Sequence, residues 1–331
     1  MKVGVGLWTG QGQDYRDVVP VAVAAEAAGF DSFWVTEHHG LPDGYLPSPL
    51  TVLAALAPVT SRITLGTGLV LAPLHHPLRL AEDAAVVDLL SGGRLVLGLG
   101  LGYAEHEYRA FGVDPRTRGS RLEALVGALR QAWTGEEFSC AALGLDRVRV
   151  TPTPAHDIPI WLGGYAETAV VRAGRIADGH LVGRGVPHIV ETASDQLGAP
   201  RTDFTRAVNV TCVLDAPGGA AASARSAFAA QQQVYESIQA GRAVYAGLVG
   251  DPSGAGLSLG SIDAYVQVAG SADDVVAGLR EVLRGLAGWP DVHLVLRLLF
   301  PEPPEVQVER LATFGREILP RLRSTTEEET P

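Results

Sequence analysis

Three polar side chains, Glu37, His38 and His39, directly follow a short β-branched and aromatic run at Ser32 to Val35. A histidine at the end of a strand can transfer protons near neutral pH. In a parallel α/β fold, the carboxyl ends of the strands are also where chemistry is found. The alternative is a loop histidine that is hydrogen-bonded to neighbouring backbone, and the residues alone leave both interpretations open.

Glycine-rich segments follow three other strand-like runs: Gly66-Thr67-Gly68-Leu69, Gly98-Leu99-Gly100-Leu101-Gly102-Tyr103 and Gly163-Gly164-Tyr165-Ala166-Glu167-Thr168. The first tolerates unusual backbone dihedrals beneath a ligand. The second lacks the later glycine of a dinucleotide fingerprint, but its glycines would let a flat ring approach the backbone. The third precedes a helix, where backbone N–H groups suit a phosphate, although an ordinary tight turn has the same composition.

Several other polar residues are interpreted as structural. His75 and His76 stand at the start of a helix without the carboxylate or cysteine ligands of a metal site, so we expect packing there and predict no metal. Arg297 interrupts an apolar strand, and because a buried arginine needs a partner, we expect a structural ion pair inside the fold. Glu105 and Glu107 are expected on a solvated helix face.

Strand-like and helix-like segments alternate along the chain. Strands are expected at Val3–Leu7, Ser32–Val35, Ile63–Thr67, Leu95–Leu99, Ile160–Leu162, His180–Val182, Ala207–Leu214 and Val292–Leu299. Helices are expected at Asp17–Ala28, Ser48–Val59, Leu78–Leu90, Arg118–Trp133, Thr168–Ala177, Pro187–Leu197 and Ala220–Ile238, with a final helix through Val308 and Ile318 that stops at Pro320. Eight strand–helix units with continuously apolar strands predict a closed α/β barrel of the (β/α)8, TIM-like type. An open doubly wound sheet is the alternative.

One domain is expected over residues 1–323, followed by a disordered tail at 324–331. Two segments interrupt the alternation and are expected as insertions at the C-terminal face of the barrel. The first is 139–159, with an edge strand at Arg147 to Val150, and the second is the glycine-rich stretch 242–261. A loop as long as the second is either a lid or disordered.

The composition limits the function classes. Of 331 residues, 47% are hydrophobic, which allows one large core. The net charge of −11, without a basic cluster, argues against a nucleic-acid surface. Cys140 and Cys212 have no disulfide or metal spacing. The chain begins without a signal-peptide pattern and has no apolar stretch long enough to span a bilayer, so a cytoplasmic protein without a membrane is expected.

Taken together, these segments resemble the bacterial luciferase-like monooxygenase superfamily. The most specific pieces are W-V-T-E-H-H, then L-G-T-G-L-V-L-A-P-L-H-H-P-L-R-L-A-E-D with L-L-S-G-G-R, and E-Y-R-A-F-G. The match runs from Val3 to about Ala177 and resumes at Val292. The resemblance implies a TIM-like barrel with an insertion, which holds a flavin or the deazaflavin F420 at its C-terminal mouth.

The resemblance also implies roles for single residues. His38 matches the active-site histidine and His39 neighbours it, so both are candidate catalytic residues. Gly68-Leu69 matches a non-prolyl cis peptide that supports the isoalloxazine ring. The cofactor-binding candidates are therefore Gly68, Leu69, Gly100, Gly102 and Tyr103, with Gly163, Gly164, Tyr165, Ala166 and Thr168 toward the phosphate. Leu101 stands where the luciferase chain has a phosphate-contacting arginine, so Arg109, Arg121 or the helix start would have to take over that contact.

The implied function is a monooxygenase in which reduced FMN and O₂ oxygenate a small organic substrate. A dry cavity would shield the flavin, and His38 would assist proton transfer. Because no nicotinamide domain is evident, a separate flavin reductase is the expected partner, and the family implies a homodimer. Two alternatives remain: F420-dependent hydride transfer, and a catalytically idle barrel that only binds flavin.

Overall fold

Eight parallel strands close into a barrel in the computed structural model, which describes residues 1–7, 14–183, 185–214, 268–299 and 302–324. The strands are β1 (Lys2–Leu7), β2 (Ser32–Val35), β3 (Thr64–Thr67), β5 (Leu95–Gly100), β8 (Ile160–Gly163), β9 (Gly179–Val182), β10 (Thr205–Leu214) and β12 (Val292–Leu299). They pair in that order, and β12 pairs with β1 to close the ring. The closed TIM-like barrel predicted from the sequence is thus confirmed, and the open sheet is not formed.

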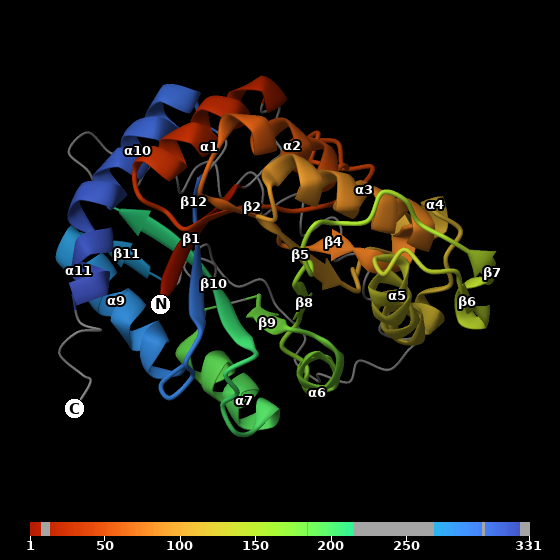
Figure 1. Cartoon of the computed structure of the whole chain (residues 1–331). Coiled ribbons are helices and arrows are strands. Elements are labelled where there is room, and N and C mark those ends of the chain that lie inside the picture. Colours follow the sequence, from red (N-terminus) through yellow and green to blue (C-terminus); the bar gives the residue numbers. More distant parts are fainter. Residues whose placement is uncertain (8–13, 184, 215–267, 300–301, 325–331) are drawn as a thin grey trace.

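Helices surround the barrel and separate its strands from solvent (Figure 1). They are α1 (Val18–Ala27), α2 (Pro49–Leu56), α3 (Pro77–Ser91), α4 (Glu105–Ala110), α5 (Arg118–Ala132), α6 (Glu167–Ile176), α7 (Pro187–Leu197), α9 (Ala272–Arg284), α10 (Pro304–Glu317) and α11 (Leu319–Arg323). Two short strands, β4 (Val70–Leu71) and β11 (Val268–Gly270), pair with β5 and β10. No helix within the described ranges is both long and apolar enough to cross a membrane.

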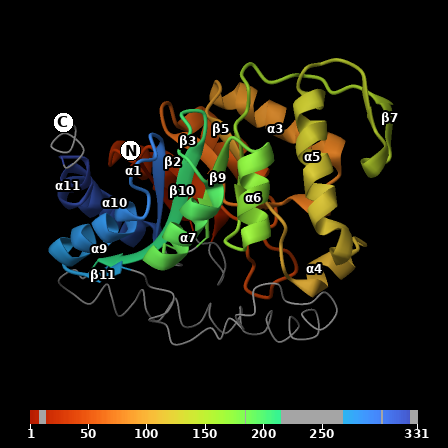
Figure 2. The ribbon, with the colours of Figure 1, turned by 90° about the horizontal axis from the view of Figure 1, so that it is seen from below.

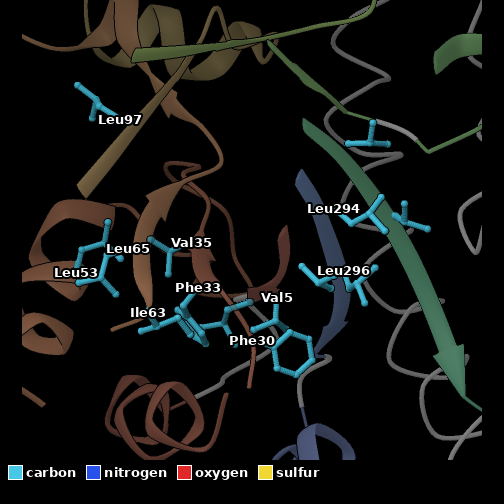
Figure 3. Packing of buried hydrophobic residues seen from close by; sticks show 14 of the residues in the cluster. Val5, Phe30, Phe33, Val35, Leu53, Ile63, Leu65, Leu97, Leu294 and Leu296 are labelled. Carbon is cyan, nitrogen blue, oxygen red and sulfur yellow. The ribbon is translucent and has the colours of Figure 1, made fainter. Parts of the chain in front are cut away.

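The alternation of side chains along each strand builds two separate apolar clusters. Residues such as Val5, Phe33 and Leu65 point outward and pack with the helices in the main core (Figure 3). Alternate residues, among them Trp34 and Ala207, point inward and form a second cluster inside the barrel. Because successive side chains of a strand point to opposite faces, a strand buried on both sides is apolar throughout.

The barrel interior is filled by aromatic rings. Trp34 and Trp161 stack with their centroids 4.9 Å apart, and His293 packs edge-on against both. A Cβ on Gly66 would lie 2.3 Å from the Trp34 ring, so only glycine fits beside it. The Trp34 indole N–H donates to Ser32 Oγ at 2.6 Å, and the same oxygen is 2.6 Å from His293 Nε2. Burial lowers the pKa of His293 to about 4, so its ring is neutral at pH 7.

The insertion at 139–159 lies at the opposite end of the barrel from the one expected. It contains an antiparallel hairpin of β6 (Phe138–Cys140) and β7 (Leu145–Val148). The hairpin connects the end of α5 to the start of β8, so it sits where the strands begin, whereas α4 lies near the other end of α5 (Figure 2). A segment that follows a helix reaches the amino-terminal end of the next strand, which explains the correction.

Two smaller expectations about helix ends are also corrected. Pro320 does not end the last helix, because it occupies the first turn of α11, where its missing N–H leaves no bond unmade. The helix expected from Asp17 begins at Val18, and the short turn before it is capped by Asp14, which accepts from the Arg16 amide at 2.9 Å. The expected helix at Ala220–Ile238, the segment 242–261 and the tail at 325–331 lie outside the described residues.

Candidate active site

The segments that the sequence singled out meet at one edge of the barrel. Residues 37–39 follow β2, Gly68 and Leu69 follow β3, residues 101–103 follow β5, and residues 164–168 follow β8. These four strands are consecutive neighbours in the barrel. Their carboxyl ends therefore form one continuous surface, which is where ligands bind in barrels of this type.

His38 is held by a buried carboxylate from α4. Its Nδ1 lies 2.9 Å from Glu107 Oε1, which also accepts from the His39 backbone amide at 2.8 Å. Glu107 has no exposed surface, and His38 is 7% exposed. Because a carboxylate can only accept, the proton of the neutral imidazole sits on Nδ1 and Nε2 is the second acceptor. Glu107 was expected on a solvated helix face, so this expectation is wrong.

Two tyrosine rings flank the His38 imidazole. Tyr45 and Tyr103 pack edge-on against it at centroid distances of 5.0 and 5.4 Å. The Tyr103 hydroxyl is 3.5 Å from His38 Nε2, at the outer limit of a hydrogen bond. The Tyr45 hydroxyl is 2.6 Å from Thr36 Oγ1, which ties the flanking loop to the end of β2. His38 Nε2 thus faces a phenol at the mouth of the barrel.

A second buried carboxylate, Glu37, holds the neighbouring segments together. Its Oε1 accepts from His39 Nε2 at 2.9 Å and from His75 Nε2 at 2.8 Å, and its Oε2 accepts from the Leu71 amide at 2.6 Å. Burial by itself would raise the pKa of Glu37, but these three hydrogen bonds reverse that effect and lower the pKa to about 2. His75 therefore does more than pack at a helix start, whereas His76 is exposed.

Helix α4 is fixed to the His38 segment by further contacts. His106 Nε2 donates to the His39 carbonyl at 2.8 Å, and the Tyr108 hydroxyl donates to the Leu101 carbonyl. With Glu107, these bonds leave the six-residue helix little freedom to shift. The imidazole of His38 is consequently oriented by a rigid support rather than by a mobile loop.

The peptide between Gly68 and Leu69 is cis, as the resemblance implied. Leu69 is partly buried and packs on top of the interior cluster that contains Trp34 and Trp161. A Cβ on Gly100 or Gly163 would lie 2.8 or 2.0 Å from Leu69 Cδ1. These two glycines therefore make room for the Leu69 side chain, whereas the sequence suggested that Gly100 admits a ring and that Gly163 lies at a phosphate site or a tight turn. The result is an apolar platform at the mouth.

The loop from β8 to α6 presents unpaired backbone amides. Gly164 has a φ of 140°, which a side chain would strain, and its N–H donates to the Leu181 carbonyl at 3.3 Å. The amides of Tyr165 and Ala166 donate to no other residue in the part of the chain that the structure describes. Thr168 is exposed in the first turn of α6. An anionic group fits here, because these amides and the helix start are electropositive.

Neither arginine suggested as a phosphate contact has a hydrogen bond that directs it toward this loop. Arg109 is exposed and paired with Glu105 at 3.1 Å. Arg121 donates to the Pro73 carbonyl at 2.9 Å and to the His75 carbonyl at 3.3 Å. Arg297 lies on the inner face of β12, where its neighbour on β10 is Thr211. The ion pair expected for Arg297 stays a prediction.

These residues fit a flat aromatic cofactor with a phosphate-bearing tail. Leu69 and the tryptophans beneath it provide an apolar surface for a ring, and the loop at 164–168 provides donors for a phosphate. Within the described ranges, no group of three His, Cys, Asp or Glu residues has the arrangement of a metal site. A hollow of about 740 Å³ that includes Trp133 and His156 lies at the opposite end, beside the connection from α5 to β8.

Comparison with known proteins identifies the family. Residues 1–287 match the model of the luciferase-like monooxygenase family. The chain belongs to this family. Among luciferase-like relatives, the oxygenase component of the flavin-dependent trigonelline monooxygenase of Acinetobacter baylyi is 32% identical over 157 residues, 46% of this chain and 44% of that protein. The F420-dependent glucose-6-phosphate dehydrogenase of Nakamurella multipartita is 34% identical over 181 residues, 51% and 52% of the two chains.

These alignments span about half the length of the curated relatives that they match. A solved luciferase-like structure covers nearly all of the chain: the oxygenating constituent of 3,6-diketocamphane monooxygenase from Pseudomonas putida, in complex with FMN. Its TM-score is 0.72 at 19% identity, over 97% of this chain and 98% of that chain. At this identity the likeness establishes the fold alone.

Sequence reasoning missed the contacts of the two carboxylates, Glu107 and Glu37, that hold this luciferase-like site together. Glu107 is 69 positions from His38, and a six-residue helix is too short for periodicity to reveal a buried face. Glu37 was noted beside the histidines, but its bond to His75 joins two separate loops. One available signal was the spacing of Glu107 from the glycines after β5, since α4 must pack over the same mouth.

Proposed function

We propose that this protein is a monooxygenase that uses reduced FMN and O₂ to oxygenate a small organic substrate. The carrying observation is the His38–Glu107 pair at the barrel mouth, beside the platform made by Leu69. An oriented imidazole next to an apolar surface suits proton transfer at the edge of a flat redox ring. Bound FMN would supply the electrons and activate O₂, and the protein would supply orientation and exclusion of water.

The residues of the chain divide this work. Leu69 and the rings beneath it would support one face of the cofactor and keep water from it. Amides of the loop at 164–168 would bind the phosphate, and Gly102 and Tyr103 would line the approach from β5. His38 Nε2 would hold and release the proton, with Nδ1 fixed by Glu107. We assign His39 to support of this loop, because its Nε2–H donates to Glu37.

A separate flavin reductase is the proposed partner. The described residues form one barrel without a nicotinamide-binding domain, and a relative of 32% identity is named as an oxygenase component. We also propose a homodimer, which light scattering of the purified protein would test directly.

F420-dependent hydride transfer is the second candidate. The observation that favours it is the sequence identity of 34% to an F420-dependent dehydrogenase, which is comparable with the identity of 32% to a flavin-dependent oxygenase component. The same platform and histidine suit a deazaflavin ring. A catalytically idle flavin-binding barrel is disfavoured, because it has no need of a buried carboxylate that orients His38.

Anaerobic titration separates these candidates. Apo protein is titrated with FMN and with F420, each in oxidised and reduced form, and binding is followed by absorbance and fluorescence. We expect reduced FMN to bind most tightly. When that complex is then mixed with O₂, it should react rapidly and consume the substrate. Tighter binding of F420 would move the protein to the hydride-transfer branch, and binding without turnover of any substrate class would support the idle barrel.

A further inference from the structure

A chain of buried polar groups runs from the back of the phosphate loop into the sheet. The Gly164 carbonyl accepts from His180 Nε2 at 2.7 Å, and His180 Nδ1 is 2.5 Å from Arg206 Nη1. Arg206 Nη2 in turn donates to Ser194 Oγ at 3.0 Å. These hydrogen bonds therefore link the loop before α6 to β9, β10 and α7, and of the groups in them only Gly164 belongs to the site described above.

The two partners fix the protonation state of His180. A carbonyl can only accept and a guanidinium can only donate, so Nε2 carries the proton and Nδ1 accepts. Burial, and then the charge of Arg206, lower the pKa of His180 to about 3. The ring thus stays neutral at pH 7. It has no exposed surface and cannot act as a proton carrier to the mouth.

Arg206 is a fully buried cation that donates to His180 and Ser194 and has no carboxylate partner among the described residues. Burial lowers its pKa to about 10, so it remains charged at pH 7. Its guanidinium carbon lies 5.4 Å from the centre of the Trp289 ring, and its Nε makes no hydrogen bond within the described ranges. A charge buried in this way is costly unless another group compensates it, and its field is weakly screened by the surrounding protein.

The bond from His180 also sets the direction of the next amide. In a planar trans peptide the carbonyl and the following N–H point in opposite directions. Since the Gly164 carbonyl points at His180, the Tyr165 N–H points away from the sheet. That amide has no acceptor among the described residues. The loop is thereby held with a donor turned outward, in front of a buried positive charge.

We propose that Arg206 and His180 are positioning residues for the anionic end of the cofactor. His180 holds the Gly164 peptide in the orientation that donates to a phosphate, and Arg206 contributes positive charge from behind the loop. The inference rests on the proposed function, because it concerns the same cofactor, and it assigns phosphate selectivity to residues that never touch the ligand.

The test compares FMN with riboflavin, which has the same ring without the phosphate. The dissociation constants of both are measured by fluorescence titration for wild type, Arg206→Met, His180→Leu and His180→Gln. Glutamine can donate to Gly164 and accept from Arg206. His180→Gln should therefore keep the ratio of the riboflavin and FMN dissociation constants within about threefold of wild type. Arg206→Met and His180→Leu should lower that ratio by about tenfold, the scale of a hydrogen bond to a charged group.

Arg94→Met is the control for loss of a partly buried arginine that donates to backbone carbonyls elsewhere in the barrel. Arg94 donates to the carbonyls of Ala57 and Ile63 at the opposite end of the barrel. This variant should lower the melting temperature and leave the ratio unchanged. If Arg206→Met does not fold, the His180→Leu and His180→Gln pair carries the same test.

Two results would overturn the inference, and they are distinguishable. In the first, wild type prefers FMN to riboflavin and the folded variants keep this preference. That result would be consistent with the phosphate site but would show that Arg206 and His180 do not contribute to it. A wild-type protein with equal affinity for FMN and riboflavin would contradict the phosphate site itself, and the inference with it. If the first titration selects F420, the same comparison uses F420 and its phosphate-free deazaflavin.

Discussion

His38 and His180 are both buried histidines beside the same mouth, and their partners give them opposite properties. His38 donates from Nδ1 to a carboxylate, Glu107, and its Nε2 faces the mouth. His180 accepts at Nδ1 from a guanidinium, Arg206, and its Nε2 is committed to a backbone carbonyl. The burial of His180 and the positive charge of Arg206 oppose protonation of its ring.

The contrast teaches that residue type and burial do not decide what a histidine can do. The hydrogen-bonding partner decides which ring nitrogen faces the mouth and which is committed to holding a peptide in place. In this barrel the ring held by Glu107 lies at the front, over the end of β2, and the ring locked between Arg206 and Gly164 lies behind the loop after β8.

Loss of the front imidazole should have the largest effect. His38→Ala is expected to lower turnover by about 10²-fold or more, with cofactor affinity within about tenfold, because an acid–base group contributes on this scale. Steady-state kinetics with a reductase and flavin titration measure the two quantities. His76→Ala, at an exposed histidine of the α3 start, is the control and should be close to wild type. Unchanged turnover in His38→Ala would remove this residue from the mechanism.

Loss of the carboxylate behind His38 should come next. Glu107→Leu leaves His38 Nδ1 and the His39 amide without their acceptor, so turnover should fall by about tenfold while substrate KM changes little. Glu107→Gln can still accept at its oxygen from both donors and should retain most of the activity. Equal activity of the two variants would mean that Glu107 serves packing alone.

The fold was more predictable from the sequence than the site. Alternating apolar strands and glycine-ended helices specify the barrel locally, and the boundaries of α7 agree with the sequence expectation. The partners of His38 and His180 come from residues 69 and 26 positions away, so only the closed barrel brings them together. Arg206 precedes the apolar strand expected at Ala207–Leu214, whereas Arg297 lies within one, so only Arg297 stood out in the sequence as a buried cation.

The locked ring should make stability depend on pH. An unfolded chain protonates His180 below the ordinary value of 6.5, whereas the folded chain does so only near 3. The stabilisation by the neutral ring is therefore complete above pH 6.5 and is lost as pH falls toward 3. The slope is up to about 1.4 kcal/mol per pH unit. His180→Gln should remove the contribution of His180 to this slope from urea unfolding curves between pH 6.5 and 5, while the contribution of His293, whose pKa is about 4, remains.

The control for this pH dependence is His188→Gln, at an exposed histidine of α7. It should follow wild type at every pH. If His180→Gln also follows wild type, the ring of His180 titrates normally and the contrast between the two histidines is lost.

The smallest effect is expected at the phenol that faces His38. The Tyr103 hydroxyl lies 3.5 Å from His38 Nε2, where a hydrogen bond is weak. Tyr103→Phe keeps the ring contact and should lower turnover by about threefold. A loss as large as that of His38→Ala would instead make Tyr103 a proton-transfer group in its own right.

The most direct measurement is a crystal structure of the protein with bound FMN. The account predicts the isoalloxazine ring on the Leu69 platform, its reactive edge within about 3.5 Å of His38 Nε2, and the phosphate on the amides after Gly164. A ring bound elsewhere on the barrel, or a His38 side chain turned away from it, would contradict the account.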